Sequence, residues 1–164
     1  MTRESFMENV RVEQEPLRRF LLALCCGDAS WADDLAQDAL LRAYVASGSF
    51  LGLSKFRTWL FRIAYNCYVD DLRKRKGKGG QEVGLEDPSA RTLPSSSEAD
   101  GSFRYQQLYM ALEKLPEKER ACISMHYFED LPLRDIASVL QMPLGTVKYN
   151  LSVGRTHLKE YLTL

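Results

Sequence analysis

The sequence predicts an all-α protein made of two small helical domains joined by a flexible linker. Apolar residues recur at spacings of three and four, as they do on one face of a helix. No segment shows the strict alternation of apolar and polar residues that is typical of a half-buried strand. Between the two helical blocks this periodicity stops, and glycine, proline and serine accumulate. We therefore divide the chain into an N-terminal block of residues 1–76, a linker of residues 77–102 and a C-terminal block of residues 103–164.

Three helices are predicted in the N-terminal block. The first covers residues 16–26, with Pro16 in its first turn, and ends at Gly27. The second covers residues 31–46, capped or flanked by Asp28. The third is capped by Ser54, runs to about residue 76 and is ended by Gly77. The block should therefore form a three- or four-helix bundle.

The C-terminal block is predicted to contain a helix-turn-helix. Its helices cover residues 103–115, 116–128, 133–141 and about 144–161, and Pro116 and Pro143 mark two of the starts. The last two helices have apolar faces that can pack together, a small residue (Ala137) at the crossing and a short turn. The buried stripe of the last helix should contain Leu144, Val147, Leu151, Gly154 and Leu158.

The opposite face of that last helix suits DNA. Lys148, Arg155 and Lys159 form a basic flank that could meet phosphates, beside a nearly neutral polar centre that could meet base edges. The alternative is a solvated helix face with no ligand.

The long helix of the N-terminal block combines aromatic and basic residues. Opposite its predicted apolar stripe it presents Thr58, Phe61, Arg62, Tyr65 and Val69, which suit stacking on unpaired bases. The alternative is that Phe61 and Tyr65 pack on a neighbouring helix. The basic run 73–76 could hold phosphates, or could simply complement the dipole at the helix end.

Composition excludes several classes of protein. The 22 basic and 22 acidic residues give no net charge, which argues against binding nucleic acid by bulk electrostatics alone. No run approaches the roughly 18 apolar residues of a membrane span, so we expect a cytoplasmic protein without membrane insertion.

The four cysteines form no CxxC pair and are expected to be buried; a redox role for Cys25 and Cys26 is the alternative. No nucleotide-binding loop, nucleophile–base pair or metal cluster is present, which predicts a protein that is no enzyme and has no cofactor.

Three stretches together resemble one family. They are DDLAQDALLRAY (33–44), FRTWLFRIAYNCYVDDLRKRK (56–76) and LPEKERACISMHYFEDLPLRDIASVLQMPLGTVKYNLSVGRTHLKEYL (115–162). In this order, on either side of a linker, they resemble an extracytoplasmic-function (ECF) sigma factor, the promoter-specificity subunit of bacterial RNA polymerase. The rival is a stand-alone helix-turn-helix regulator, which would not explain the first two stretches. A helical interaction module without a DNA role is a rival of another class.

The resemblance implies a role for each stretch. The partners would be the clamp helices of core RNA polymerase, promoter DNA and an anti-sigma factor. The loop 50–55 and the helix after it would capture an extruded base of the minus-10 element. The implied polymerase-docking residues are Asp34, Gln37, Asp38 and Arg42. The implied minus-10 residues are Arg57, Thr58, Trp59, Phe61, Arg62, Tyr65, Asn66 and Arg73. The implied minus-35 residues are Thr146, Lys148, Tyr149, Asn150, Ser152, Val153, Arg155 and Lys159.

The chain departs from the family pattern in the helix-turn-helix. Gln141 stands in the turn where the family often has glycine, and Asn150 and Val153 stand where it often has Arg or Lys. Gln141 should either avoid a positive φ or strain the turn.

Overall fold

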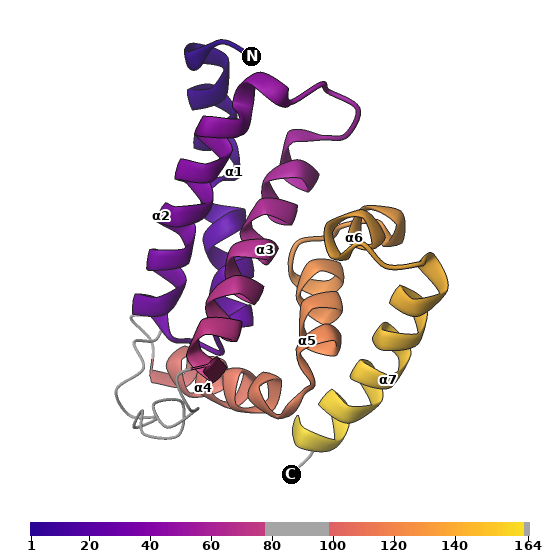
Figure 1. Cartoon of the computed structure of the whole chain (residues 1–164). Helices are drawn as coiled ribbons and strands as arrows, with labels where there is room; N and C mark the ends of the chain where they lie inside the picture. The colour runs from indigo at the N-terminus through magenta and orange to yellow at the C-terminus, as the bar shows by residue number, and fades with distance from the viewer. Residues whose placement is uncertain (78–98, 163–164) are drawn as a thin grey trace.

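The computed structural model describes residues 1–77 and 99–162, and these segments contain helices and no β-strand. The all-α prediction is therefore confirmed. The N-terminal block contains α1 (Arg3–Leu24), α2 (Ala29–Ala46) and α3 (Phe56–Gly77), with a 3-10 turn at Ser47–Ser49. These three long helices lie side by side (Figure 1).

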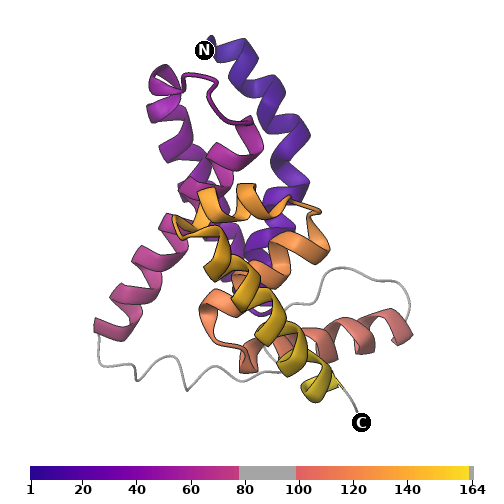
Figure 2. The same ribbon diagram turned by 90° about the vertical axis from the view of Figure 1, so that its right-hand side faces the viewer.

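The C-terminal block packs against α3 and the end of α1 (Figures 1 and 2). It contains α4 (Ala99–Lys114), α5 (Glu117–Ile123), a π-helical turn (Ser124–Phe128), α6 (Leu133–Leu140) and α7 (Leu144–Leu162). Helices α6 and α7 form the predicted helix-turn-helix. Most of the predicted linker falls outside the described residues, but α4 begins at Ala99, earlier than the predicted residue 103. None of the described helices has the length and apolar character needed to cross a membrane.

Helix α1 is much longer than the sequence suggested. The predicted start at Pro16 is wrong, because Pro16 lies inside the helix and the hydroxyl of Thr2 caps the true start by accepting from the Ser5 N–H at 3.1 Å. The extra turns are stabilised by Phe6, which is 3% exposed and packs edge-on against the rings of Tyr44 and Phe56. This burial of an aromatic ring compensates for the backbone hydrogen bond that an internal proline removes.

The turn between α1 and α2 matches its prediction. Gly27 has φ +89°, and a Cβ at this position would lie 2.8 Å from Cδ2 of Tyr109, so both the backbone and the space favour glycine. Asp28 caps α2 by accepting from the Trp31 N–H at 3.1 Å. This contact of Tyr109 with Gly27 is also one of the points where the two blocks meet.

Helix α3 is buried on more than one side. Its predicted stripe packs on α1 and α2, but the face predicted to lie opposite the core is not free. Phe61 is 0% exposed and stacks on Phe20 with ring centroids 4.7 Å apart, so the expectation of an outward-facing Phe61 is wrong. Thr58 and Tyr65 are buried as well, because α6 and the start of α5 cover this side of the helix. The sequence pattern of one helix cannot show that two separate blocks will enclose it.

The core of the C-terminal block depends on a close helix crossing. A Cβ at Gly154 of α7 would lie 3.1 Å from Cγ1 of Ile123 and 3.3 Å from Cβ of Glu119 on α5. Val147 and Leu151 are buried as predicted, whereas Leu144 is 43% exposed because it lies at the very start of α7. Gln141 has φ +52° and its N–H donates to the carbonyl of Ala137, so the turn does use a left-handed residue.

All four cysteines are buried and none of them forms a disulfide. Burial raises the pKa of Cys67 and of Cys122 to about 12, and it also raises the pKa of Cys25 well above its usual value. A neutral, inaccessible thiol is a poor nucleophile. The cysteines therefore pack as small apolar residues, as expected from the sequence.

Candidate nucleic-acid and polymerase-binding surfaces

The outer face of α7 carries the predicted minus-35 surface, which is defined by the eight residues proposed for that role. Tyr149 at its centre is 65% exposed. Asn150 and Val153 are half-buried and the other six are exposed. The Asn150 amide donates to the carbonyl of Thr146 at 2.9 Å, which keeps this side chain along the helix surface. The face therefore offers an aromatic ring and hydroxyls at its centre and cations on its flank.

Helix α2 carries the predicted docking surface. Asp34 and Gln37 are exposed on it. The guanidinium of Arg42 lies between two carboxylates, 3.2 Å from that of Asp38 and 3.3 Å from that of Asp70 on α3. These ion pairs hold this end of the docking surface against α3.

Sequence reasoning missed an apolar part of the same helix surface. Leu41 is 64% exposed and Val45 is 79% exposed. They follow Gln37 at successive spacings of four residues, so the three side chains lie along one line of the helix. The four-residue spacing of these side chains in the sequence could have revealed the apolar part of the surface. Exposed apolar groups beside acidic ones are suited to a partner that is both basic and apolar.

The loop before α3 is held by aromatic packing. Phe50 lies 5.0 Å from Trp59 and 6.0 Å from Phe56, measured between ring centroids. Beyond this anchor, Leu51 is 79% exposed and Leu53 is 89% exposed. Trp59 therefore positions the loop from the inside, while the loop tip faces solvent.

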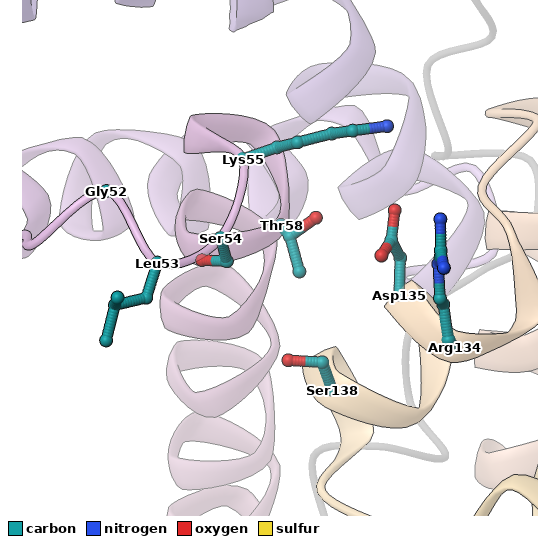
Figure 3. Close-up of a pocket in the computed structure, with 8 residues that line it drawn as sticks. All are labelled: Gly52, Leu53, Ser54, Lys55, Thr58, Arg134, Asp135 and Ser138. Atoms are coloured by element: carbon teal, nitrogen blue, oxygen red, sulfur yellow. The ribbon is translucent and has the colours of Figure 1, made fainter.

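A polar groove of about 670 Å³ separates this loop and the start of α3 from α6 (Figure 3). Lys55 and Arg134 line opposite sides of it. The hydroxyl of Thr58 and one carboxylate oxygen of Asp135 are buried and make no hydrogen bond to another described protein atom. The predicted base-capture loop thus borders directly on the helix-turn-helix.

Several predicted minus-10 residues are bonded to the C-terminal block. The Arg62 guanidinium donates to the backbone carbonyl of Ser138 at 3.1 Å and to its hydroxyl at 2.6 Å. The Tyr65 hydroxyl donates to the carboxylate of Glu117, and burial followed by this hydrogen bond raises the pKa of Tyr65. Arg57 donates to Glu13 at 2.6 Å and, weakly, to the carbonyl of Glu129 at 3.5 Å.

Two of the eight proposed minus-10 residues stay accessible. Asn66 and Arg73 are exposed, and Arg73 lies 3.6 Å from the carboxylate of Asp70 on its own helix. The structure therefore does not bring the eight residues together on one free face. Phe61 is in the core, Trp59 supports the loop, and Arg57, Thr58, Arg62 and Tyr65 face the other block.

Two charged residues that sequence reasoning did not select join the blocks. The side chain of Glu129 is 0% exposed and accepts two hydrogen bonds from Arg19 of α1, at 2.9 and 3.2 Å. Burial raises the pKa of Glu129, and the facing guanidinium only partly offsets this effect. Arg120 donates to the carbonyl of Leu24 and to the hydroxyl of Tyr68, both at 3.1 Å. Only the three-dimensional pairing reveals these residues, because they lie far apart in the sequence.

Comparison with known proteins defines the class. Sigma-70 region 2 matches residues 10–78 and Sigma-70 region 4 matches residues 105–158. The chain is 36% identical to ECF RNA polymerase sigma factor SigW of Bacillus subtilis over 146 residues, which cover 83% of this chain and 78% of that one. It is 31% identical to ECF RNA polymerase sigma factor EcfG of Rhodopseudomonas palustris over 160 residues, covering 97% of this chain and 86% of that one.

A solved structure shares the fold over nearly the full chain. It is the sigma factor RpoE from Bartonella quintana, in complex with the anti-sigma factor NepR, with a TM-score of 0.84, 26% identity and 98% of each chain covered. The fold and its two matched regions therefore define an RNA polymerase sigma factor, which is a non-enzymatic transcription initiation factor. Within this class, the chain belongs to the ECF sigma factors.

Proposed function

We propose that this sigma factor uses three separate helix surfaces to place RNA polymerase on a promoter. The surface of α2 around Asp34 and Gln37 binds the clamp helices of core polymerase. The loop 50–55 and α3 bind the minus-10 element, and the outer face of α7 binds the minus-35 element in the major groove. The observation that carries the proposal is the exposed face of α7, where a polar centre lies beside Lys148, Arg155 and Lys159.

The low charge of α7 fits a protein that does not bind promoters alone. Each phosphate contact contributes about 0.9 to the salt dependence of DNA binding, and α7 offers few cations for such contacts. The remaining affinity would come from the minus-10 surface on the same chain and from the polymerase, because a tethered second site acts at high effective concentration.

We also propose that the chain acts in the cytoplasm and is regulated by an anti-sigma factor. Support comes from the Bartonella quintana sigma factor RpoE, which was solved bound to the anti-sigma factor NepR and resembles this chain over 98% of its length.

Transcription with purified core polymerase tests the proposed function. Run-off transcription on a library of genomic promoter fragments should give discrete, promoter-dependent transcripts that core polymerase alone does not give. If the folded protein produced none, the proposal would be refuted. A stand-alone helix-turn-helix regulator would instead bind duplex promoter DNA tightly without polymerase. Nanomolar binding of duplex DNA by the isolated protein at physiological salt would favour that alternative.

A further inference from the structure

The polar groove between the loop before α3 and helix α6 has the size of a small-molecule site. Its volume of about 670 Å³ lies within the roughly 300–1,000 Å³ that is typical of such sites. Residues 52–55 and Thr58 form one wall, and Arg134, Asp135 and Ser138 of α6 form the other (Figure 3). The α6 wall contains no residue of the proposed minus-35, minus-10 or docking surfaces.

Two buried polar atoms of the groove have no hydrogen-bond partner among the described protein atoms. Thr58 is 2% exposed, and its hydroxyl points towards Asp135 on α6 (Figure 3). One carboxylate oxygen of Asp135 is also buried and accepts no hydrogen bond from a described residue. Burying a polar atom without a hydrogen bond is unfavourable. The two atoms therefore favour a ligand that brings a hydrogen-bond donor to Asp135 and a polar group to Thr58.

Ser138 adds a hydrogen-bond donor to the α6 wall. Its hydroxyl oxygen accepts from the guanidinium of Arg62 at 2.6 Å, and its backbone carbonyl accepts from the same group at 3.1 Å. These two bonds fix the position of Ser138 beside the groove. A serine hydroxyl carries one O–H donor besides its lone pairs. Because Arg62 only donates, the O–H of Ser138 is left to donate to a ligand.

Two cations lie at the rim of the groove. Lys55 and Arg134 are exposed on opposite sides of it (Figure 3), and neither forms an ion pair within residues 1–77 and 99–162. Ammonium and guanidinium groups are the usual protein partners of phosphates. The Asp135 carboxylate would repel a phosphate placed next to it. A ligand with both kinds of contact therefore has phosphates at the rim and an uncharged part with N–H groups beside Asp135.

A guanine nucleotide divides its charge in this way. The Watson–Crick edge of guanine carries two adjacent N–H donors, one on N1 and one on the exocyclic amino group, and a carboxylate can accept from both. The edges of adenine and cytosine place a donor next to an acceptor, which would face the carboxylate unfavourably. The donor pair of guanine is thus the base edge that fits Asp135.

We propose that this groove binds a guanine nucleotide. Asp135 accepts from the base, Thr58 and Ser138 bond to the base or the ribose, and Lys55 and Arg134 hold the phosphates. The sequence has no Walker-type phosphate loop, and the proposal is one of binding without hydrolysis. It depends on neither promoter nor polymerase binding, so its failure would leave the proposed function untouched.

Calorimetric titration of the whole chain measures this binding directly. GTP should bind saturably, with one-to-one stoichiometry and a micromolar dissociation constant. ITP lacks the exocyclic amino group of guanine and should bind more weakly by on the order of tenfold, because one hydrogen bond to a charged acceptor is lost. ATP and inorganic tripolyphosphate should bind more weakly still. Guanosine, which has no phosphate, should lose the contribution of the rim cations.

A change of base specificity tests the role of Asp135. Asp135→Asn replaces one acceptor oxygen by an amide donor and should weaken GTP binding by on the order of tenfold or more. The same variant should bind XTP more tightly than the unchanged protein does, because xanthine has a carbonyl where guanine has its amino group. A gain of this kind cannot result from loss of the fold. The control is Asp130→Asn, at an exposed aspartate that does not line the groove.

The rim is tested by a second matched pair. Arg134→Ala should weaken the binding of GTP and leave the binding of guanosine unchanged, since only GTP carries phosphates. Arg104→Ala, at an exposed arginine of α4, should alter neither. Neither Arg134 nor Asp135 belongs to a proposed DNA-binding or polymerase-binding surface, so these variants probe the nucleotide site alone.

Several results would overturn the proposal. One is the absence of saturable GTP binding by the folded chain. Another is an affinity for ATP or tripolyphosphate equal to that for GTP, because the base would then contribute nothing specific. A third is an Asp135→Asn variant that keeps its GTP affinity and gains none for XTP, which would place the nucleotide outside this groove.

Discussion

Arg62 and Ser138 are joined by two hydrogen bonds, at 3.1 Å to the backbone carbonyl and 2.6 Å to the hydroxyl, although they belong to different helical blocks. The first residue lies on the helix proposed to bind the minus-10 element, and the second lies in the helix-turn-helix proposed to bind the minus-35 element. The two parts of the chain that we propose bind DNA therefore contact each other.

The docking surface on α2 can be tested without disturbing the fold. Asp34 and Gln37 are exposed, so Asp34→Ala with Gln37→Ala should leave helical content unchanged while affinity for core polymerase falls on the order of tenfold. Binding can be followed by fluorescence anisotropy of labelled protein. Glu160→Ala on α7 is the control for loss of an exposed acidic residue. Unchanged affinity in the double variant would refute the docking assignment.

The basic flank of α7 predicts a specific change in salt dependence. Lys148→Ala with Arg155→Ala should weaken promoter binding by the complete holoenzyme and reduce the slope of log K against log salt by about 0.9 for each lost phosphate contact. Titration of a fixed promoter fragment at several salt concentrations measures this slope. Arg11→Ala, an exposed arginine of α1, should leave it unchanged. An unaltered slope in the double variant would mean that these two cations do not meet phosphates.

Phe61 and Asn66 were both proposed as minus-10 residues, and the structure predicts different consequences for them. Phe61→Ala removes a fully buried ring stacked on Phe20 and should lower the free energy of unfolding by about 3–5 kcal/mol. Asn66→Ala changes an exposed side chain and should alter stability by less than about 0.5 kcal/mol, while lowering run-off transcription several-fold. Chemical denaturation and run-off assays measure the two effects. Full transcription by Asn66→Ala would remove it from the proposed site.

The crossing of α5 and α7 leaves little room for a side chain at Gly154. Gly154→Val would push against Ile123 and the Cβ of Glu119, and overpacking of this kind costs about 1–3 kcal/mol of unfolding free energy. Gly145→Val, on the same helix, meets nothing within 4 Å and should change stability by about 0.5 kcal/mol or less. Thermal or urea unfolding would compare the pair, and equal stability would contradict the tight crossing.

The turn of the helix-turn-helix should be improved by glycine. Gln141 holds φ +52°, a conformation that costs a non-glycine residue roughly 1 kcal/mol, so Gln141→Gly should raise the free energy of unfolding by up to that amount. Gln106→Gly, at an exposed position inside α4, should instead lower it by about 1 kcal/mol. Urea unfolding of both variants checks the opposite signs. Destabilisation by Gln141→Gly would show that the glutamine side chain stabilises this turn.

Local patterns in the sequence were sufficient to predict the all-helical class of the described residues and the exposed face of α7. Three features that depend on neighbours in the chain were predicted: the turn at Gly27, the cap at Asp28, and the buried stripe of Val147 and Leu151. The start of α1 was not, because the burial of Phe6 against Tyr44 and Phe56 is a contact between distant segments. The resemblance to ECF sigma factors was also recognisable from motif order, and it was confirmed.

Tertiary structure alone decided which surfaces are free. A helical repeat distinguishes one apolar face from the rest of a helix. Helix α3 is enclosed by both blocks, and the pattern of residues 56–77 alone does not predict this second buried side. The partners of Arg19 and Arg62, Glu129 and Ser138, lie in the other block and follow the linker. Such pairs form because a buried carboxylate needs a cation, and a partly buried guanidinium needs hydrogen-bond acceptors, wherever the fold brings them. The sequence thus determined the family of this protein, and the packing of its two blocks determined which of the proposed binding surfaces is covered.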